Sequence, residues 1–243
     1  MQVADGVHRL TGGVCNFYVI EGSGKLVLVD AGTPADWKLL LRHLATLGRR
    51  IDDIDSVLLT HAHADHTGFA ERARTEAGAR VWVHSADAAV ARSGKPPSHE
   101  GGLVKYLVHA EAYRTVFSLL RRGGTRIVPI AQVSTFGDGE AIDVPGRPRA
   151  VHAPGHTAGS AAVLFEAQSV LLTGDALVTR NPLTGRIGPQ VMPSGFNADT
   201  KLALQSLRAL TAGGAQTVLP GHGEPWTGGA AEAVRLAEHA GPS

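Results

Sequence analysis

The segment Val57-Leu58-Leu59-Thr60-His61-Ala62-His63-Ala64-Asp65-His66 is the most informative part of this 243-residue sequence. It begins with an apolar run that favours a buried β-strand and ends with three histidines and one aspartate. Side chains two apart on a strand lie on the same face, so His61 and His63 can share a metal ion, and His66 can join them only if the chain turns there. Small Ala62 and Ala64 permit that turn, and Asp65 is placed to cap a following helix. The segment therefore predicts a metal site at a strand end.

Three later segments supply further candidate ligands. His156 lies in the glycine-rich turn Pro154–Ser160, Asp175 follows an apolar strand in a Thr-Gly-Asp turn, and His222 lies in Leu219–Gly223 after another strand. Each segment alone is a weak signal, but each places a metal-type side chain on a loop at a strand end, where sites are normally built. Imidazole and carboxylate without thiolate suit zinc, manganese or iron in a catalytic site with an open position.

Short apolar runs bounded by glycine and proline predict strands that alternate with helices. Strands are expected at 14–21, 25–30, 56–60, 80–83, 126–129, 140–144, 149–153, 161–166, 170–173 and 217–219. Helices are expected at 34–47, 67–77, 103–121, 199–210 and after Gly229. Two comparable halves of this kind predict an α/β fold in which two sheets pack together with helices outside, forming one domain over residues 1–243.

Residues 86–124 are expected to form a helical insertion between the two halves, with a loop rich in Gly, Pro and Ser at 93–102 and a helix at 103–121. Leu103–Arg121 carries an apolar stripe with steps of four and three, formed by Tyr106, Ala110, Tyr113, Phe117 and Leu120. Two interpretations stay open. The helix packs on the core, or it is a lid or homodimer element in which Tyr106, Tyr113 and Phe117 cover the substrate or a partner subunit.

Composition limits the function classes. A net charge of +1 gives no basic field for nucleic acid, and no apolar run is long enough for a transmembrane helix. Met1–Leu10 has no signal-peptide pattern, and the single cysteine, Cys15, fits a reducing compartment and has no activating base beside it. We expect a cytoplasmic protein with a small-molecule substrate and neither a nucleic-acid nor a membrane partner.

On these motifs the chain resembles the metallo-β-lactamase superfamily, from the turn at Val29–Gly32 to Gly223. The resemblance implies a four-layer αββα sandwich with two divalent metal ions at one edge of the sheets. It implies that one ion is held by His61, His63 and His156, the other by Asp65, His66 and His222, and that Asp175 bridges both. Zinc is the leading assignment, and iron and manganese remain open.

The metal set points to hydrolysis. Two ions about 3.5–4 Å apart can hold a hydroxide that is nucleophilic at neutral pH, and Asp65 is the expected catalytic residue that orients it. The chain resembles the glyoxalase II-like and lactonase-like branches, which implies a small ester, thioester or lactone substrate. It leaves no room after His222 for the glutathione-binding C-terminal region of glyoxalase II. Substrate contacts are expected from Thr179–Phe196 and Leu103–Arg121.

Other functions stay open. An iron-dependent persulfide dioxygenase, which is an oxidoreductase, resembles the chain at the same loops. Phosphodiesterase or nuclease activity shares the metal set, and β-lactamase activity fits less well because antibiotic-hydrolysing members lack a bridging aspartate at position 175. A non-catalytic, metal-stabilised interaction protein is the last class. No Gly-x-Ser-x-Gly pattern supports a serine hydrolase.

Residues around the ligands receive separate expectations. His84 and His152 are candidates for partners that orient the ligands. Asp30 is expected to be a buried structural acceptor near the site. The remaining histidines are expected on the surface or in packing, at positions 8, 43, 99, 109 and 239.

Overall fold

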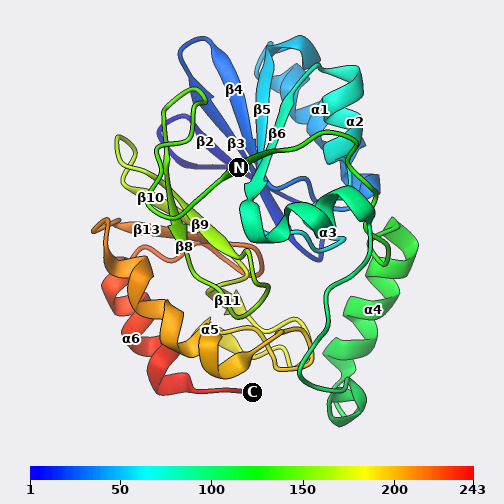
Figure 1. Ribbon diagram of the computed structural model, residues 1–243, viewed down its shortest axis with the longest axis vertical. Helices are drawn as coiled ribbons and strands as arrows, with labels where there is room; N and C mark the ends of the chain where they lie inside the picture. The colour runs from blue at the N-terminus through cyan, green and yellow to red at the C-terminus, as the bar shows by residue number, and fades with distance from the viewer.

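The computed structural model describes residues 1–243 and contains two main sheets (Figure 1). The larger sheet holds seven strands in chain order: β1 (Gln2–Ala4), β2 (Val7–Thr11), β3 (Asn16–Gly22), β4 (Lys25–Val29), β5 (Ile54–Leu59), β6 (Arg80–His84) and β7 (Ser134–Phe136). The smaller sheet has the order β13 (Thr217–Pro220), β10 (Val170–Gly174), β9 (Ala161–Phe165) and β8 (Arg149–His152). Strands β11 (Val178–Arg180) and β12 (Ile187–Gln190) form a separate antiparallel pair.

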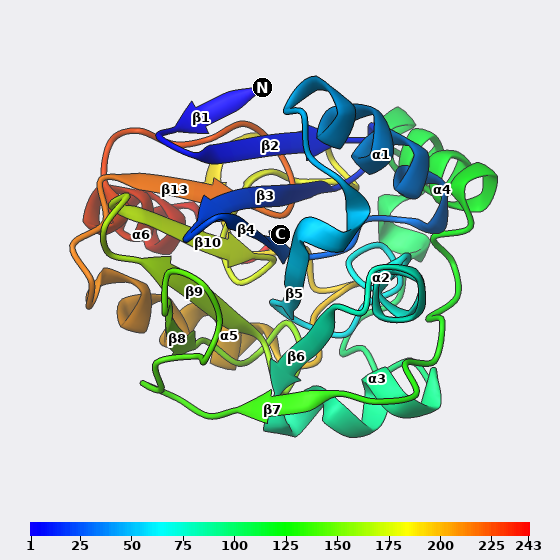
Figure 2. The same cartoon turned by 90° about the horizontal axis from the view of Figure 1, so that it is seen from above.

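Helices cover the outer faces of both sheets. The α-helices are α1 (Trp37–Thr46), α2 (Ala70–Glu76), α3 (Ala88–Ser93), α4 (Ala110–Arg122), α5 (Thr200–Ser206) and α6 (Ala230–Ala240). Short 3₁₀ segments are η1 (Pro34–Asp36), η2 (Ile51–Asp53), η3 (Ser85–Asp87), η4 (Val104–Tyr106) and η5 (Leu207–Thr211). Figures 1 and 2 show α1 to α3 beside the larger sheet and α5 and α6 beside the smaller one. None of these helices is both long and apolar enough to span a membrane.

Alternation along strand β4 shows how the layers form. Leu26 and Leu28 pack into the core under α1 and α2, whereas Val27 and Val29 face the smaller sheet. A strand covered on both faces needs apolar side chains at every position, which explains the continuous Leu-Val-Leu-Val run. Phe165 and Leu172 complete the core between the sheets, and a third core lies under α5 and α6. The predicted four-layer αββα arrangement is confirmed.

Most predicted elements are confirmed with shifted ends. Ser23 and Gly24 both have positive φ, 50° and 76°, which is the two-residue hairpin turn that joins β3 to β4. Three predictions are wrong. The strand predicted at Arg126–Pro129 is irregular, because Pro129 has no amide hydrogen to donate to a neighbouring strand and no strand lies beside it. The strand predicted at Glu140–Val144 makes only an isolated bridge, from Ala141 to Arg149. The helix predicted from Thr67 begins at Ala70, so Asp65 caps nothing.

The helix predicted over Leu103–Arg121 is interrupted. Its first turn is η4, the backbone is extended at His109, and α4 runs from Ala110 to Arg122. Tyr106 is buried, but Tyr113 and Phe117 are 58% and 60% exposed, so the apolar stripe does not pack on the core of the chain. The face that packs inward carries Ala112 and Thr115 instead.

Candidate metal centre

The metal-type side chains lie where the two sheets meet. β5 ends at Leu59, and residues 60–69 form the turns that lead into α2. The amide of Ala161, at the start of β9, donates to the carbonyl of Thr60 at 2.9 Å and so joins the edges of the sheets. Because β8, β10 and β13 run in one direction, the loops that follow them also reach this edge.

The structure brings all seven predicted ligands together in three overlapping groups. Within each group the ligand atoms lie within 4.8 Å of one another, a spacing that can hold a metal ion. The groups are His61, His63 and His156; His61, His66 and Asp175; and Asp65, His66 and His222.

The first group is the tightest. His156 Nε2 lies 2.8 Å from His63 Nδ1 and 3.2 Å from His61 Nε2. In the last group, Asp65 Oδ2 lies 3.6 Å from His222 Nε2 and 3.8 Å from His66 Nε2. These are the two ligand triads that the resemblance implies.

Asp175 lies between the two triads. Its Oδ2 is 3.2 Å from His222 Nε2 and 3.4 Å from His156 Nε2, and its Oδ1 is 3.4 Å from His66 Nε2. A Cβ at position 221 would lie 2.2 Å from this carboxylate, so only glycine lets the loop after β13 approach so closely. The carboxylate therefore faces ligands of both triads, as a bridging position requires.

Outer hydrogen bonds fix the orientation of the imidazoles. His66 Nδ1 lies 2.8 Å from Asp30 Oδ2, and His222 Nδ1 lies 2.8 Å from the carbonyl of Val14, both of which can only accept. His156 Nδ1 faces Asn197 Oδ1 at 3.1 Å in the same way. Neutral rings that donate outward through Nδ1 keep the lone pair of Nε2 directed inward, which is the tautomer a metal ligand needs.

Charge in the site is unbalanced without a cation. Burial lowers the pKa of His61 and of His63 well below the usual value and also lowers that of His156, with neighbouring histidines adding to the effect for the first two. For His66 burial acts in the same direction, but Asp175, Asp65 and Asp30 outweigh it and raise the pKa to about 10. The pKa of Asp175 is well below its usual value because His222 and His66 overcome the effect of burial. Asp30, Asp65 and Asp175 therefore stabilise positive charge at the position of His66.

These features fit divalent metal ions. His66 Nε2 and Asp175 Oδ1 are buried and have no hydrogen-bond partner within the chain. Leaving such atoms unsatisfied costs about 1–3 kcal/mol each, more for a charged group, and a metal ion would satisfy both. The nitrogens of His63 and His156 can lie 2.8 Å apart with inward lone pairs only if a cation or a shared proton lies near them.

Sequence reasoning missed one anchoring carboxylate. Asp87 accepts hydrogen bonds from the amides of Ala62 and Gly159 and from Thr157 Oγ1, at 2.8–2.9 Å. It thereby ties the loop of His61 and His63 to the loop of His156. A Cβ at Gly159 would lie 2.6 Å from Asp87, so this contact requires glycine. Asp87 also follows a strand, β6, and the strand-end argument used for the ligands could have found it.

Other expectations have mixed outcomes. Asp30 is the buried acceptor that was expected, holding the amide and hydroxyl of Thr60 as well as His66. His84 and His152 stack on each other with ring centroids 4.0 Å apart and contact no ligand, so that prediction is wrong. Burial raises the pKa of the Cys15 thiol, which agrees with the prediction that it is not a nucleophile.

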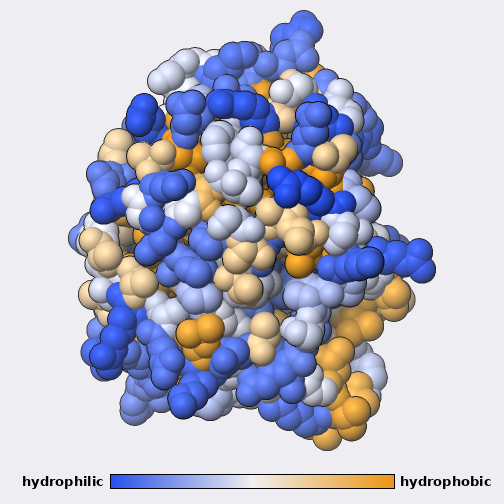
Figure 3. All heavy atoms as spheres, in the orientation of Figure 1, coloured by the Kyte–Doolittle hydropathy of each residue, from blue (hydrophilic) through white to orange (hydrophobic).

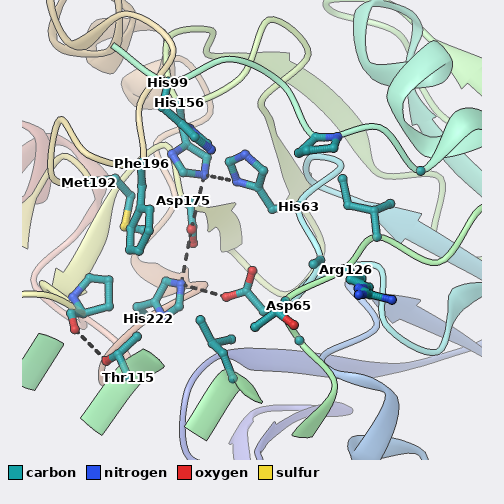
Figure 4. Close-up of a pocket in the computed structure, with 18 residues that line it drawn as sticks. His63, Asp65, His99, Thr115, Arg126, His156, Asp175, Met192, Phe196 and His222 are labelled. Atoms are coloured by element: carbon teal, nitrogen blue, oxygen red, sulfur yellow. Dashed lines mark hydrogen bonds and ion pairs between the residues drawn. The ribbon is translucent and has the colours of Figure 1, made fainter. Parts of the chain in front are cut away.

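A cavity of about 420 Å³ opens onto the metal-type residues. Figure 4 shows His63, Asp65, His156, Asp175 and His222 grouped together, with Met192 and Phe196 along one side and Arg126 on the other. α4 contributes Thr115 and Leu119 to the wall, so both segments expected to contact substrate line the cavity. Tyr113 and Phe117 do not line it and lie on the outer face of α4.

Fold and site together describe a metallo-hydrolase of the αββα class. The sequence model of the metallo-β-lactamase superfamily matches residues 10–222, and the chain belongs to this superfamily.

Named relatives agree with this assignment. The probable metallo-hydrolase YflN of Bacillus subtilis is 24% identical over 93% of this chain and 87% of its own. The atrochrysone carboxyl ACP thioesterase AacuM of Aspergillus aculeatus is 26% identical over 86% of this chain and 50% of its own. The metallo-β-lactamase family protein TTHA1429 of Thermus thermophilus superposes with a TM-score of 0.68 at 29% identity, covering 98% and 80% of the two chains.

Proposed function

We propose that this protein is a two-metal hydrolase that cleaves a small ester, thioester or lactone, with zinc as its metal. The observation that supports the proposal is the convergence of seven ligand residues, six in two triads and Asp175 between them. His61, His63 and His156 would hold one ion, and Asp65, His66 and His222 the other. Five imidazoles and two carboxylates without thiolate suit zinc in an open catalytic site.

Bound ions would polarise the attacked carbonyl and lower the pKa of a water ligand to about 7. The chain itself supplies the positioning. Asp65 and Asp175 both line the cavity, but the side chain of Asp65 is 17% exposed and that of Asp175 only 2%. Asp65 is therefore the carboxylate placed to orient the attacking water and to accept its proton.

The cavity favours a small carbonyl substrate over a nucleic acid. Its volume is that of a small-molecule site, and Leu119, Ile127, Met192 and Phe196 give it apolar walls. Arg126 is its only lysine or arginine, whereas a phosphodiester backbone is normally held by several cations. The similarity to AacuM, which is named a thioesterase, adds support for a thioester.

The test is a substrate panel with the zinc-loaded protein. Matched thioesters, esters and lactones are compared with phosphodiesters and β-lactams, and oxygen consumption is followed with a persulfide and the iron-loaded protein. We expect turnover only in the first group and its loss in Asp65→Asn. Turnover confined to phosphodiesters or β-lactams, or persulfide-dependent oxygen consumption with one iron per chain, would replace the proposal.

A further inference from the structure

The outer face of α4 carries an apolar surface that no part of the chain covers. Exposed fractions are 42% for Leu103, 78% for Val104, 51% for Leu107, 83% for Val108, 58% for Tyr113, 42% for Val116, 60% for Phe117 and 62% for Leu120. We call these eight residues the α4 patch. Figure 3 shows hydrophobic residues gathered at the lower right, where Figure 1 places α4 and the segment before it.

The patch is large enough for a stable interface. With roughly 150–250 Å² of accessible surface for each fully exposed residue, from valine to tyrosine, these fractions leave on the order of 900 Å² exposed. The largest apolar patch of a typical monomer is about 300–600 Å². Each partner of a standard protein interface contributes about 800 Å², so the α4 patch matches one side of such an interface.

The patch contains an apolar groove and exposed apolar residues outside it. A groove of about 640 Å³ runs between the segment before α4 and the helix, lined by Leu107, Tyr113, Phe117 and Leu120 among others, and almost all of its lining is hydrophobic. Val104 and Val108 do not line the groove and are the most exposed apolar residues of the patch. The patch thus carries an exposed apolar tip, Val104 and Val108, next to an apolar groove, and two copies related by a two-fold axis can each place this tip against the groove of the other.

We propose that a second copy of this chain covers the α4 patch in an antiparallel homodimer. The 13 residues of α4 span about 20 Å, with the Val104–Val108 tip at one end and Leu120 at the other. Antiparallel packing places the tip of each copy in the groove of the other. Thr115 and Leu119 line the substrate cavity from the same helix, so the dimer braces a wall of both active sites.

The oligomeric state in solution tests the proposal. The wild type should sediment as a dimer across the micromolar range, and Val108→Glu and Phe117→Glu should each give monomers. Both side chains are exposed, so circular dichroism and metal content should match the wild type. Ile187→Glu is the matched control, because Ile187 is 69% exposed and lies outside the patch, and it should stay dimeric.

A cross-link tests the antiparallel arrangement. Cys15 is buried, so Val108→Cys and Leu120→Cys chains that are mixed and oxidised should join to each other in preference to themselves. A monomeric wild type would overturn the proposal, whether the patch then binds lipid vesicles or nothing. A dimer that persists in both glutamate variants, or cross-linking only between identical chains, would overturn it as well.

Discussion

Asp30→Asn removes a negative charge behind one metal triad while keeping the shape of the side chain. Asp30 is buried with φ of 61°, a left-handed conformation that asparagine also tolerates, so the backbone needs no change. The carboxylate serves three donors: the amide of Thr60, its hydroxyl, and His66 Nδ1. An amide group has one oxygen and must turn its NH₂ toward one of these donors.

The size of the effect follows from these contacts. If the NH₂ group of the new asparagine faces His66, it opposes the N–H at Nδ1 of that ring, and both groups are donors. The alternative is that the proton of His66 moves from Nδ1 to Nε2, and Nε2 then has no lone pair for the metal ion. Loss of a hydrogen bond to a charged group costs about 1.5–3 kcal/mol. Loss of an outer partner of a metal-binding histidine costs about 10–100-fold in affinity, or roughly 1.4–2.8 kcal/mol, which is the same range.

Competition with a chelator, followed site by site, measures this effect. We expect Asp30→Asn to weaken the ion at Asp65, His66 and His222 by about 10–100-fold and the other ion much less. Asp87→Asn is the matched variant, because Asp87 anchors the loops of His61, His63 and His156, and it should show the reverse order. If Asp30→Asn bound each of the two ions as tightly as the wild type does, the reasoning would be refuted.

Three further predictions follow from the same site. Asp175→Ala should lose activity and at least one metal while the far-ultraviolet circular dichroism stays close to that of the wild type; normal metal content with normal turnover would remove Asp175 from the site. Metal binding at pH 7 should release at least about one proton, because the pKa of His66 is about 10 in the metal-free chain, so that affinity rises with pH from neutral toward 10. Titration calorimetry in buffers of different ionisation enthalpy measures this, and binding without proton release would contradict it. Leu119→Ala should raise kcat/KM for bulkier acyl groups relative to small ones by about tenfold, because Leu119 lines the cavity and is only partly buried. An unchanged preference across a series of acyl chain lengths would show that Leu119 does not contact the substrate.

The fold and the ligand set could be predicted because each has a strong local signal. Continuous apolar runs such as Leu26–Val29 are required where a strand is covered on both faces, and a turn at His61–His66 is required for His66 to face the same site as His61 and His63. The four ligand segments follow strands whose ends meet at one edge. These signals can be read in the sequence without knowledge of the tertiary contacts.

The missed features depend on contacts between distant segments. Asn197 supports His156 from a loop 41 residues away, and no sequence motif around it indicates this contact. Strand β7 has only three residues and lies at the edge of the sheet, so it forms only because it pairs with β6. His84 follows a predicted strand and His152 is near His156 in sequence, yet their side chains stack against each other. The sequence also could not show that the apolar stripe of α4 points away from the core, because the pattern is the same whether the core or a partner covers the stripe.

The number of metal ions per chain tests the central claim most directly. The purified protein is loaded with zinc, freed of excess metal, and measured by elemental analysis against its amino-acid content. Two triads that share Asp175 predict two ions per chain, falling to one or none in Asp175→Ala. A single tightly held ion in the wild type, with the second triad empty even in excess zinc, would contradict the two-metal account.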